Sequence, residues 1–131
     1  MRKTYPFGIG KEKEVYRAIE KRKLLLPDLS YECRVKNFFN LRERPDYLFS
    51  DMVTGRHVFL EVKPWEVRIK DMEQLLRYLV HIEEEGDGDY DLALLCFTIK
   101  ENRRKILEQL GIRVFTFEDC IFSSHDLEYW Y

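Results

Sequence analysis

The chain has 131 residues, of which 35% are charged and 15% aromatic, and its formal net charge is −2 at pH 7. This length is that of one domain, and the supply of apolar and aromatic residues argues against disorder. The small negative charge argues against a protein that coats nucleic acid without specificity, and the lack of a long apolar run or apolar leader predicts a cytoplasmic protein with no membrane partner.

The hydrophobic pattern changes its period along the chain and predicts eight elements in the order α-β-β-β-α-β-α-β. Helical spacing ends before Pro27, and strict alternation of apolar and polar residues follows it. A turn at Thr54 and Gly55 joins two of the strands. The predicted elements are a helix at 11–26, strands at 30–36, 45–49 and 56–63, a helix at 67–85, a strand at 91–97, a helix at 102–110 and a strand at 112–117. We therefore expect an α/β fold with a mixed sheet.

The helix at 67–85 is predicted to bury one stripe of apolar side chains and to carry Gln74 and Tyr78, one turn apart, along its edge. The members of the predicted stripe are Met72, Leu75, Leu76, Leu79 and Ile82. Separately, the chain has three cysteines, widely spaced and in apolar or strand-like surroundings, which we interpret as reduced core thiols: Cys33, Cys96 and Cys120.

Asp46, Glu61 and Lys63 lie on two neighbouring predicted strands. Residues two apart share a strand face, so Glu61 and Lys63 are expected on one side while Val58, Leu60 and Val62 enter the core. If the strands form a hairpin, Asp46 falls opposite Glu61. Two carboxylates beside an ammonium suit a site for Mg²⁺ or Mn²⁺, in which the lysine orients a water or steadies a developing phosphate charge.

These residues resemble the PD-(D/E)XK nuclease superfamily, whose pattern stands here as Pro45-Asp46 followed by Glu61-Val62-Lys63. Pro64 is expected to end the strand because it lacks a backbone donor. Gln74 and Tyr78 resemble a further element of the RecB-like branch. The resemblance covers about residues 10–117, and it leaves 118–131 as an aromatic tail.

The resemblance implies a single domain over residues 1–131 with a restriction-endonuclease-like core of three α/β/α layers. It also implies a Mg²⁺- or Mn²⁺-dependent DNA endonuclease, active in repair, recombination, transposition or restriction. Asp46, Glu61 and the carbonyl of Val62 would hold the metal, and Lys63 would take part in the reaction. Many relatives add a glutamate from the first helix, for which Glu14 is the candidate here, with Glu12 close behind. Gln74 would assist at the site.

Alternatives remain at each level. Glu14 better fits a surface charge that pairs along the helix. Gln74 also fits an exposed helix position, and the charged residues of the two strands fit a buried ion network. The whole chain fits a non-cleaving nucleic-acid-binding module, or a subunit whose specificity comes from a recombination or recognition partner. A homodimer is expected, because cutting both strands of a duplex takes two sites, and the aromatic tail is its predicted contact.

Overall fold

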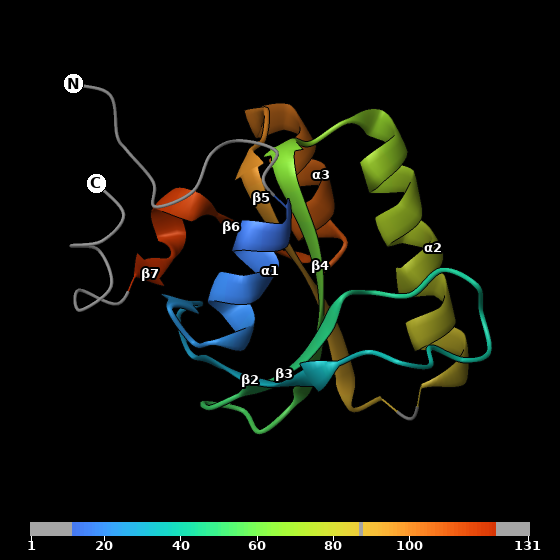
Figure 1. Ribbon diagram of the computed structural model, residues 1–131. Coiled ribbons are helices and arrows are strands. Elements are labelled where there is room, and N and C mark those ends of the chain that lie inside the picture. Colours follow the sequence, from blue (N-terminus) through green and yellow to red (C-terminus); the bar gives the residue numbers. More distant parts are fainter. Residues whose placement is uncertain (1–11, 87, 123–131) are drawn as a thin grey trace.

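The computed structural model describes residues 12–86 and 88–122 and forms an α/β fold around one mixed sheet (Figure 1). Its helices are α1 (Glu12–Glu20), α2 (Ile69–Glu85) and α3 (Glu101–Gln109), with a short 3₁₀ helix, η1 (Phe117–Asp119). Its strands are β1 (Leu24–Leu25), β2 (Leu29–Arg34), β3 (Tyr47–Asp51), β4 (His57–Glu66), β5 (Tyr90–Thr98), β6 (Arg113–Thr116) and β7 (Ile121–Phe122).

The central sheet has five strands in the order β2-β3-β4-β5-β6. The first three form an antiparallel meander, whereas β5 and β6 lie parallel to β4. This confirms the predicted fold class, and the predicted order of elements is present with additions near both ends. Strands β1 and β7 pair with each other in a separate two-stranded sheet, which the sequence pattern did not predict because two-residue strands show no period.

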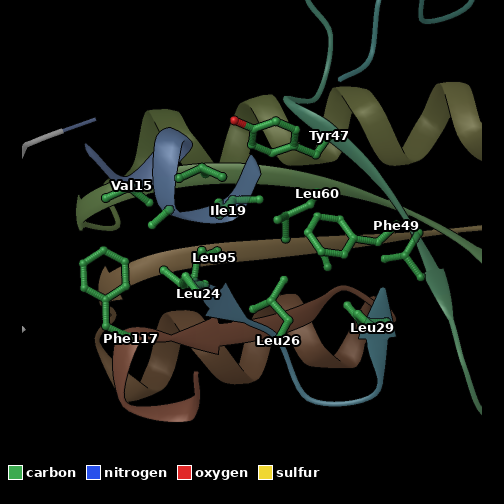
Figure 2. Packing of buried hydrophobic residues seen from close by; sticks show 14 residues of the cluster. Val15, Ile19, Leu24, Leu26, Leu29, Tyr47, Phe49, Leu60, Leu95 and Phe117 are labelled. Carbon is green, nitrogen blue, oxygen red and sulfur yellow. The ribbon is translucent and has the colours of Figure 1, made fainter. Parts of the chain in front are cut away.

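Helices cover both faces of the sheet, and each face has its own apolar core. On the α1 side, Val15 and Ile19 pack against alternate residues of the central strands, among them Leu60 and Leu95 (Figure 2). On the other side, α2 and α3 pack against the residues in between, such as Leu94. Because side chains alternate along a strand, β4 and β5 contribute to both cores. The arrangement is the predicted sandwich of three layers.

The first predicted helix, at 11–26, is too long. Helix α1 ends at Glu20, where the N–H of Lys23 bonds to Ala18 O at 2.8 Å and the N–H of Arg22 bonds to Ile19 O at 3.0 Å. Arg22 has a φ of 58°, so the chain leaves the helix through a left-handed conformation. Glycine is the residue that most often occupies this position at a helix end. The leucines that follow continue the apolar pattern, but they belong to β1 and to the core.

Strand β4 runs through Pro64 to Glu66, so the expectation that Pro64 ends the strand is wrong. Its pairing with β5 shifts register between Lys63 and Glu66. At such an irregularity the ladder is locally interrupted, so a proline without an N–H is tolerated there.

Two burial predictions also fail in part. Cys33 is exposed, because the register of β2 shifts between Tyr31 and Cys33, whereas Cys96 is buried as predicted.

On α2, Tyr78 is fully buried and Leu76 is exposed, the reverse of the predicted stripe and edge. Met72, Leu75 and Ile82 are buried as predicted, so the buried face of α2 includes Tyr78 in place of Leu76.

Among the helices that the structure describes, none is long and apolar enough to cross a membrane. The tail predicted at 118–131 begins within η1 and β7, and residues 123–131, which carry most of its aromatic side chains, lie outside the described residues.

Candidate functional site

Asp46 directly precedes β3 and is held by the backbone of β4. Its N–H donates to Leu60 O at 3.0 Å, and its carboxylate Oδ2 accepts the N–H of Val62 at 2.7 Å. Tyr47 pairs with Leu60 in the antiparallel ladder, and the same register places Asp46 beside Glu61. The sequence-based register is therefore confirmed, and the two carboxyl groups converge.

Glu61 is the most constrained of these residues, with only 4% of its surface exposed. Its Oε2 accepts from Lys63 Nζ at 3.1 Å, while its Oε1 is buried and has no hydrogen-bond partner among the described residues. Burial and the charge of Asp46 raise the pKa of Glu61 to about 8, against the opposing effect of Lys63. Burial also raises the pKa of Asp46, although the N–H of Val62 opposes this.

Two acidic groups thus converge beside a single ammonium group, and the raised pKa of Glu61 reflects the cost of ionising both of them. A buried polar atom without a partner is costly, and two adjacent carboxylates cannot both ionise cheaply without a cation nearby. A hard divalent cation, which takes oxygen ligands, is the kind of group that this donor set fits. No cluster of three or more Asp, Glu, His or Cys side chains that could hold a metal occurs within 12–86 and 88–122, so further oxygens would come from backbone and water.

Tyr16 of α1 is a site residue that the sequence reasoning missed. Its hydroxyl donates to Asp46 Oδ1 at 3.4 Å, and its pKa is raised by burial and by the negative charges of Asp46, Glu12 and Glu61. Glu12 and Tyr16 are four residues apart, so they share one helix face. That spacing was a signal present in the sequence.

Glu14 is exposed. The charge of Glu12 contributes to the raised pKa of Tyr16, whereas Glu14 is not among the residues that raise it. Glu14 does not line the cleft that contains Asp46 and Glu61. Its assignment to the site stays a prediction, and of the two glutamates Glu12 is the one that the electrostatics connect to the site.

Gln74 and Tyr78 both line that cleft, from the α2 side. Gln74 Nε2 donates to Glu43 Oε2 at 3.1 Å, so its amide engages the segment before β3 rather than Asp46 or Glu61. Tyr78 packs edge-on against Phe38, with ring centroids 5.3 Å apart, and burial followed by the charge of Glu61 raises its pKa.

The cleft has a volume of about 670 Å³ and opens between α1, the segment at 35–46 and α2. Asp46 and Glu61 line it, with Tyr16 on the α1 side. Lys63 stands beside it, with Nζ 5.6 Å from the ring centroid of Trp65. The arrangement can bind a cation between two carboxylates and present an ammonium group next to it.

Comparison with known proteins finds no matching family model and no matching curated protein. Solved structures do match: a complex of EndoMS with dsDNA at 19% identity and a TM-score of 0.63, and a repair endonuclease from Pyrococcus abyssi at 21% and 0.58. EndoMS in its apo form matches at 19% and 0.56. Each match covers 88% of this chain but only 47–49% of the other, so the chain spans about half the length of those proteins. At these identities, what the chain shares with the three endonuclease structures is the fold.

Proposed function

We propose that this chain is a DNA endonuclease of the PD-(D/E)XK superfamily that depends on Mg²⁺ or Mn²⁺. The observation that carries the proposal is the buried Oε1 of Glu61, which lies next to the carboxyl group of Asp46 and has no hydrogen-bond partner within 12–86 and 88–122. A structural ion pair would satisfy both oxygens of Glu61, since a partly satisfied buried network costs stability. A metal ligand, in contrast, needs a free oxygen.

Asp46, Glu61 and the carbonyl of Val62 are the proposed metal ligands. Mg²⁺ commonly takes one or two carboxylates and keeps several waters, which fits a site with two carboxyl groups. A bound divalent ion would supply Lewis-acid stabilisation of the phosphate and a more acidic water. The chain itself orients the ligands: the N–H of Val62 directs Asp46, and Lys63 directs Glu61.

Lys63 is proposed as a catalytic residue. Its side chain is 15% exposed and its ammonium group lies 3.1 Å from Glu61 Oε2, so it can also reach a water or a phosphate oxygen at the cleft. An ammonium in this position orients the attacking water or stabilises the charge that develops on the phosphate.

DNA as substrate is supported by the fold comparison, because one of the matching structures is a complex of EndoMS with dsDNA and another is a repair endonuclease. Those proteins are about twice as long as this chain. A specificity or recombination partner that recognises the DNA is a further part of the proposal.

The test begins with incubation of the purified protein with supercoiled, linear, flapped and four-way DNA in Mg²⁺ or Mn²⁺. The matched variants are Glu61→Gln and Glu84→Gln, since Glu84 is an exposed glutamate near the end of α2. We expect the wild type and Glu84→Gln to cut and Glu61→Gln to be inactive. Equal cutting by Glu61→Gln would overturn the assignment of the site.

Metal binding is measured separately, by calorimetric titration with Mn²⁺ in the absence of DNA. We expect binding that Asp46→Ala abolishes, because this substitution removes one of the two carboxylate ligands. Unchanged affinity in Asp46→Ala would remove the metal site. A protein that binds Mn²⁺ and DNA but cuts none of the substrates would be the non-cleaving module instead.

A further inference from the structure

The segment at 35–46 connects β2 to β3, and Figure 1 shows it running out from the sheet toward α2. Its last part carries the run Arg42-Glu43-Arg44. All three of these residues line the cleft that contains Asp46 and Glu61. This segment thus brings two guanidinium groups to the edge of a site whose own side chains are mainly acidic.

Arg42 and Arg44 are exposed, and neither makes an ion pair or a side-chain hydrogen bond with any residue that the structure describes. Other arginines are engaged with carboxylates. The paired ones include Arg34, Arg56, Arg68, Arg77, Arg104 and Arg113. The charges of Arg42 and Arg44 are therefore available to a ligand in the cleft.

Glu43, between the two arginines, faces α2. Its carboxylate accepts from Arg77 Nε at 2.6 Å, from Arg77 Nη2 at 3.0 Å and from Gln74 Nε2 at 3.1 Å. The hydrogen bonds from Arg77 hold the pKa of Glu43 below its ordinary value, so Glu43 stays charged. Earlier in the segment, Phe38 is buried against Tyr78. The segment is thus anchored at both Phe38 and Glu43.

From this geometry we propose that Arg42 and Arg44 form a phosphate-binding subsite, which holds a backbone phosphate of the nucleic acid next to the phosphate at Asp46 and Glu61. The subsite rests on the proposed function and names how the strand is positioned in the cleft. A guanidinium group matches phosphate geometry through paired N–H donors. Glu43 and Gln74 act as positioning residues, because they fix the backbone that presents the two arginines.

Binding of fluorescent DNA oligonucleotides, measured by anisotropy in EDTA, tests the subsite without catalysis. Arg42→Gln/Arg44→Gln is compared with Lys100→Gln/Lys105→Gln, which also removes two exposed positive charges. We expect the arginine variant to bind about tenfold or more weakly, and its salt dependence to fall by about 0.9 in slope for each phosphate that the variant no longer neutralises. The lysine variant should keep the wild-type slope. Equal slopes in both double variants and the wild type would overturn the subsite.

Glu43→Ala distinguishes a positioned subsite from general charge attraction. If only net charge mattered, removal of a negative charge from the cleft would tighten DNA binding. Because Glu43 anchors the segment, we expect several-fold weaker binding instead. Tighter binding by Glu43→Ala would overturn the positioning role of Glu43.

Failure of the subsite and failure of the proposed function give different results. Cleavage that requires Glu61, together with an unchanged salt slope in the arginine variant, would refute the subsite and keep the nuclease. A reduced slope in a protein that never cuts DNA would support the phosphate subsite and refute the nuclease.

Discussion

At Glu61, burial and the neighbouring Asp46 act in the same direction, and both favour the protonated acid. The raised pKa of Glu61 favours the protonated acid in the metal-free protein. A divalent cation must displace that proton, so metal binding is coupled to proton release. The ammonium group of Lys63 partly offsets the cost of ionising Glu61. Substitution of Lys63 therefore tests whether this residue acts in catalysis or only stabilises the fold.

Lys63→Met keeps much of the apolar stem and deletes the ammonium group. We expect single-turnover cleavage to fall by about 10²-fold or more, the scale for loss of a positioned proton-transfer or electrostatic group. The melting temperature of the metal-free protein should change little, because the raised pKa of Glu61 favours the neutral acid, which leaves no unpaired charge. Lys70→Met, at an exposed position of α2, is the control. Unchanged cleavage by Lys63→Met would contradict the catalytic role.

Tyr16→Phe removes the hydroxyl that donates to Asp46 Oδ1 at 3.4 Å. Loss of a group that orients a ligand typically lowers metal affinity about 10- to 100-fold, and this long hydrogen bond should fall at the lower end. The readout is the Kd for Mn²⁺ from calorimetry. Tyr47→Phe is the matched control, because the hydroxyl of Tyr47 donates to Glu20 Oε2 at 2.6 Å and to the backbone O of Tyr16 at 3.5 Å, and neither of these hydrogen bonds involves Asp46. Equal Mn²⁺ affinity for Tyr16→Phe and the wild type would remove Tyr16 from the site.

Among the elements, the β3–β4 hairpin sets the register that brings Asp46 to Glu61, and a charge network holds its far end. Asp51 Oδ1 accepts the N–H groups of Val53 at 2.8 Å and Thr54 at 3.1 Å, and its Oδ2 pairs with Arg113 Nη1 at 2.7 Å. Arg113 also pairs with Asp91 at 2.7 Å. The network thereby connects the turn to the beginnings of β5 and β6.

Asp51 should make the protein sensitive to acid. Its hydrogen bond to Arg113 and those to the turn lower the pKa of Asp51 to about 2, from an ordinary 3.8. A lowered carboxyl pKa stabilises the fold above about pH 4, and this stabilisation is lost as the pH falls toward 2. Asp51→Asn should therefore lower the melting temperature at pH 7 and flatten its decline between pH 4 and pH 2. The control is Glu118→Gln, at an exposed position. An equally steep decline in Asp51→Asn would contradict the assignment.

For the whole molecule, the three layers produce the cleft that contains the paired carboxylates. In the proposed nuclease, one such site would cut one strand at a time. Hydrolysis of both strands of a duplex requires two cuts, and two copies of the chain related by twofold symmetry would supply one site for each strand. We therefore expect light scattering to give twice the 16.0 kDa mass of the chain at tens of micromolar. A monomer mass with and without DNA would contradict the homodimer. Its predicted contact, the aromatic tail, lies mainly at 123–131, outside the described residues.

The sequence by itself determined the class of the fold and the central part of the candidate site. Apolar run lengths and turn residues carry local information, so the order of the main elements could be predicted. The alternation of two strands and the turn between them were also enough to pair Asp46 with Glu61. Helix ends and strand irregularities were less predictable, because a left-handed Arg22 or a register shift at Pro64 depends on contacts made elsewhere.

Only the tertiary structure decided which polar groups from distant segments meet. Tyr16 reaches Asp46 across 30 residues, and Glu43 engages Gln74 across 31, contacts that no local period encodes. The same holds for the buried Oε1 of Glu61, which has no hydrogen-bond partner among the described residues. Sequence periodicity indicates which face of an element is apolar, but it contains no distance between elements. The packing of α1, the segment at 35–46 and α2 around the sheet is therefore what assembles the cleft.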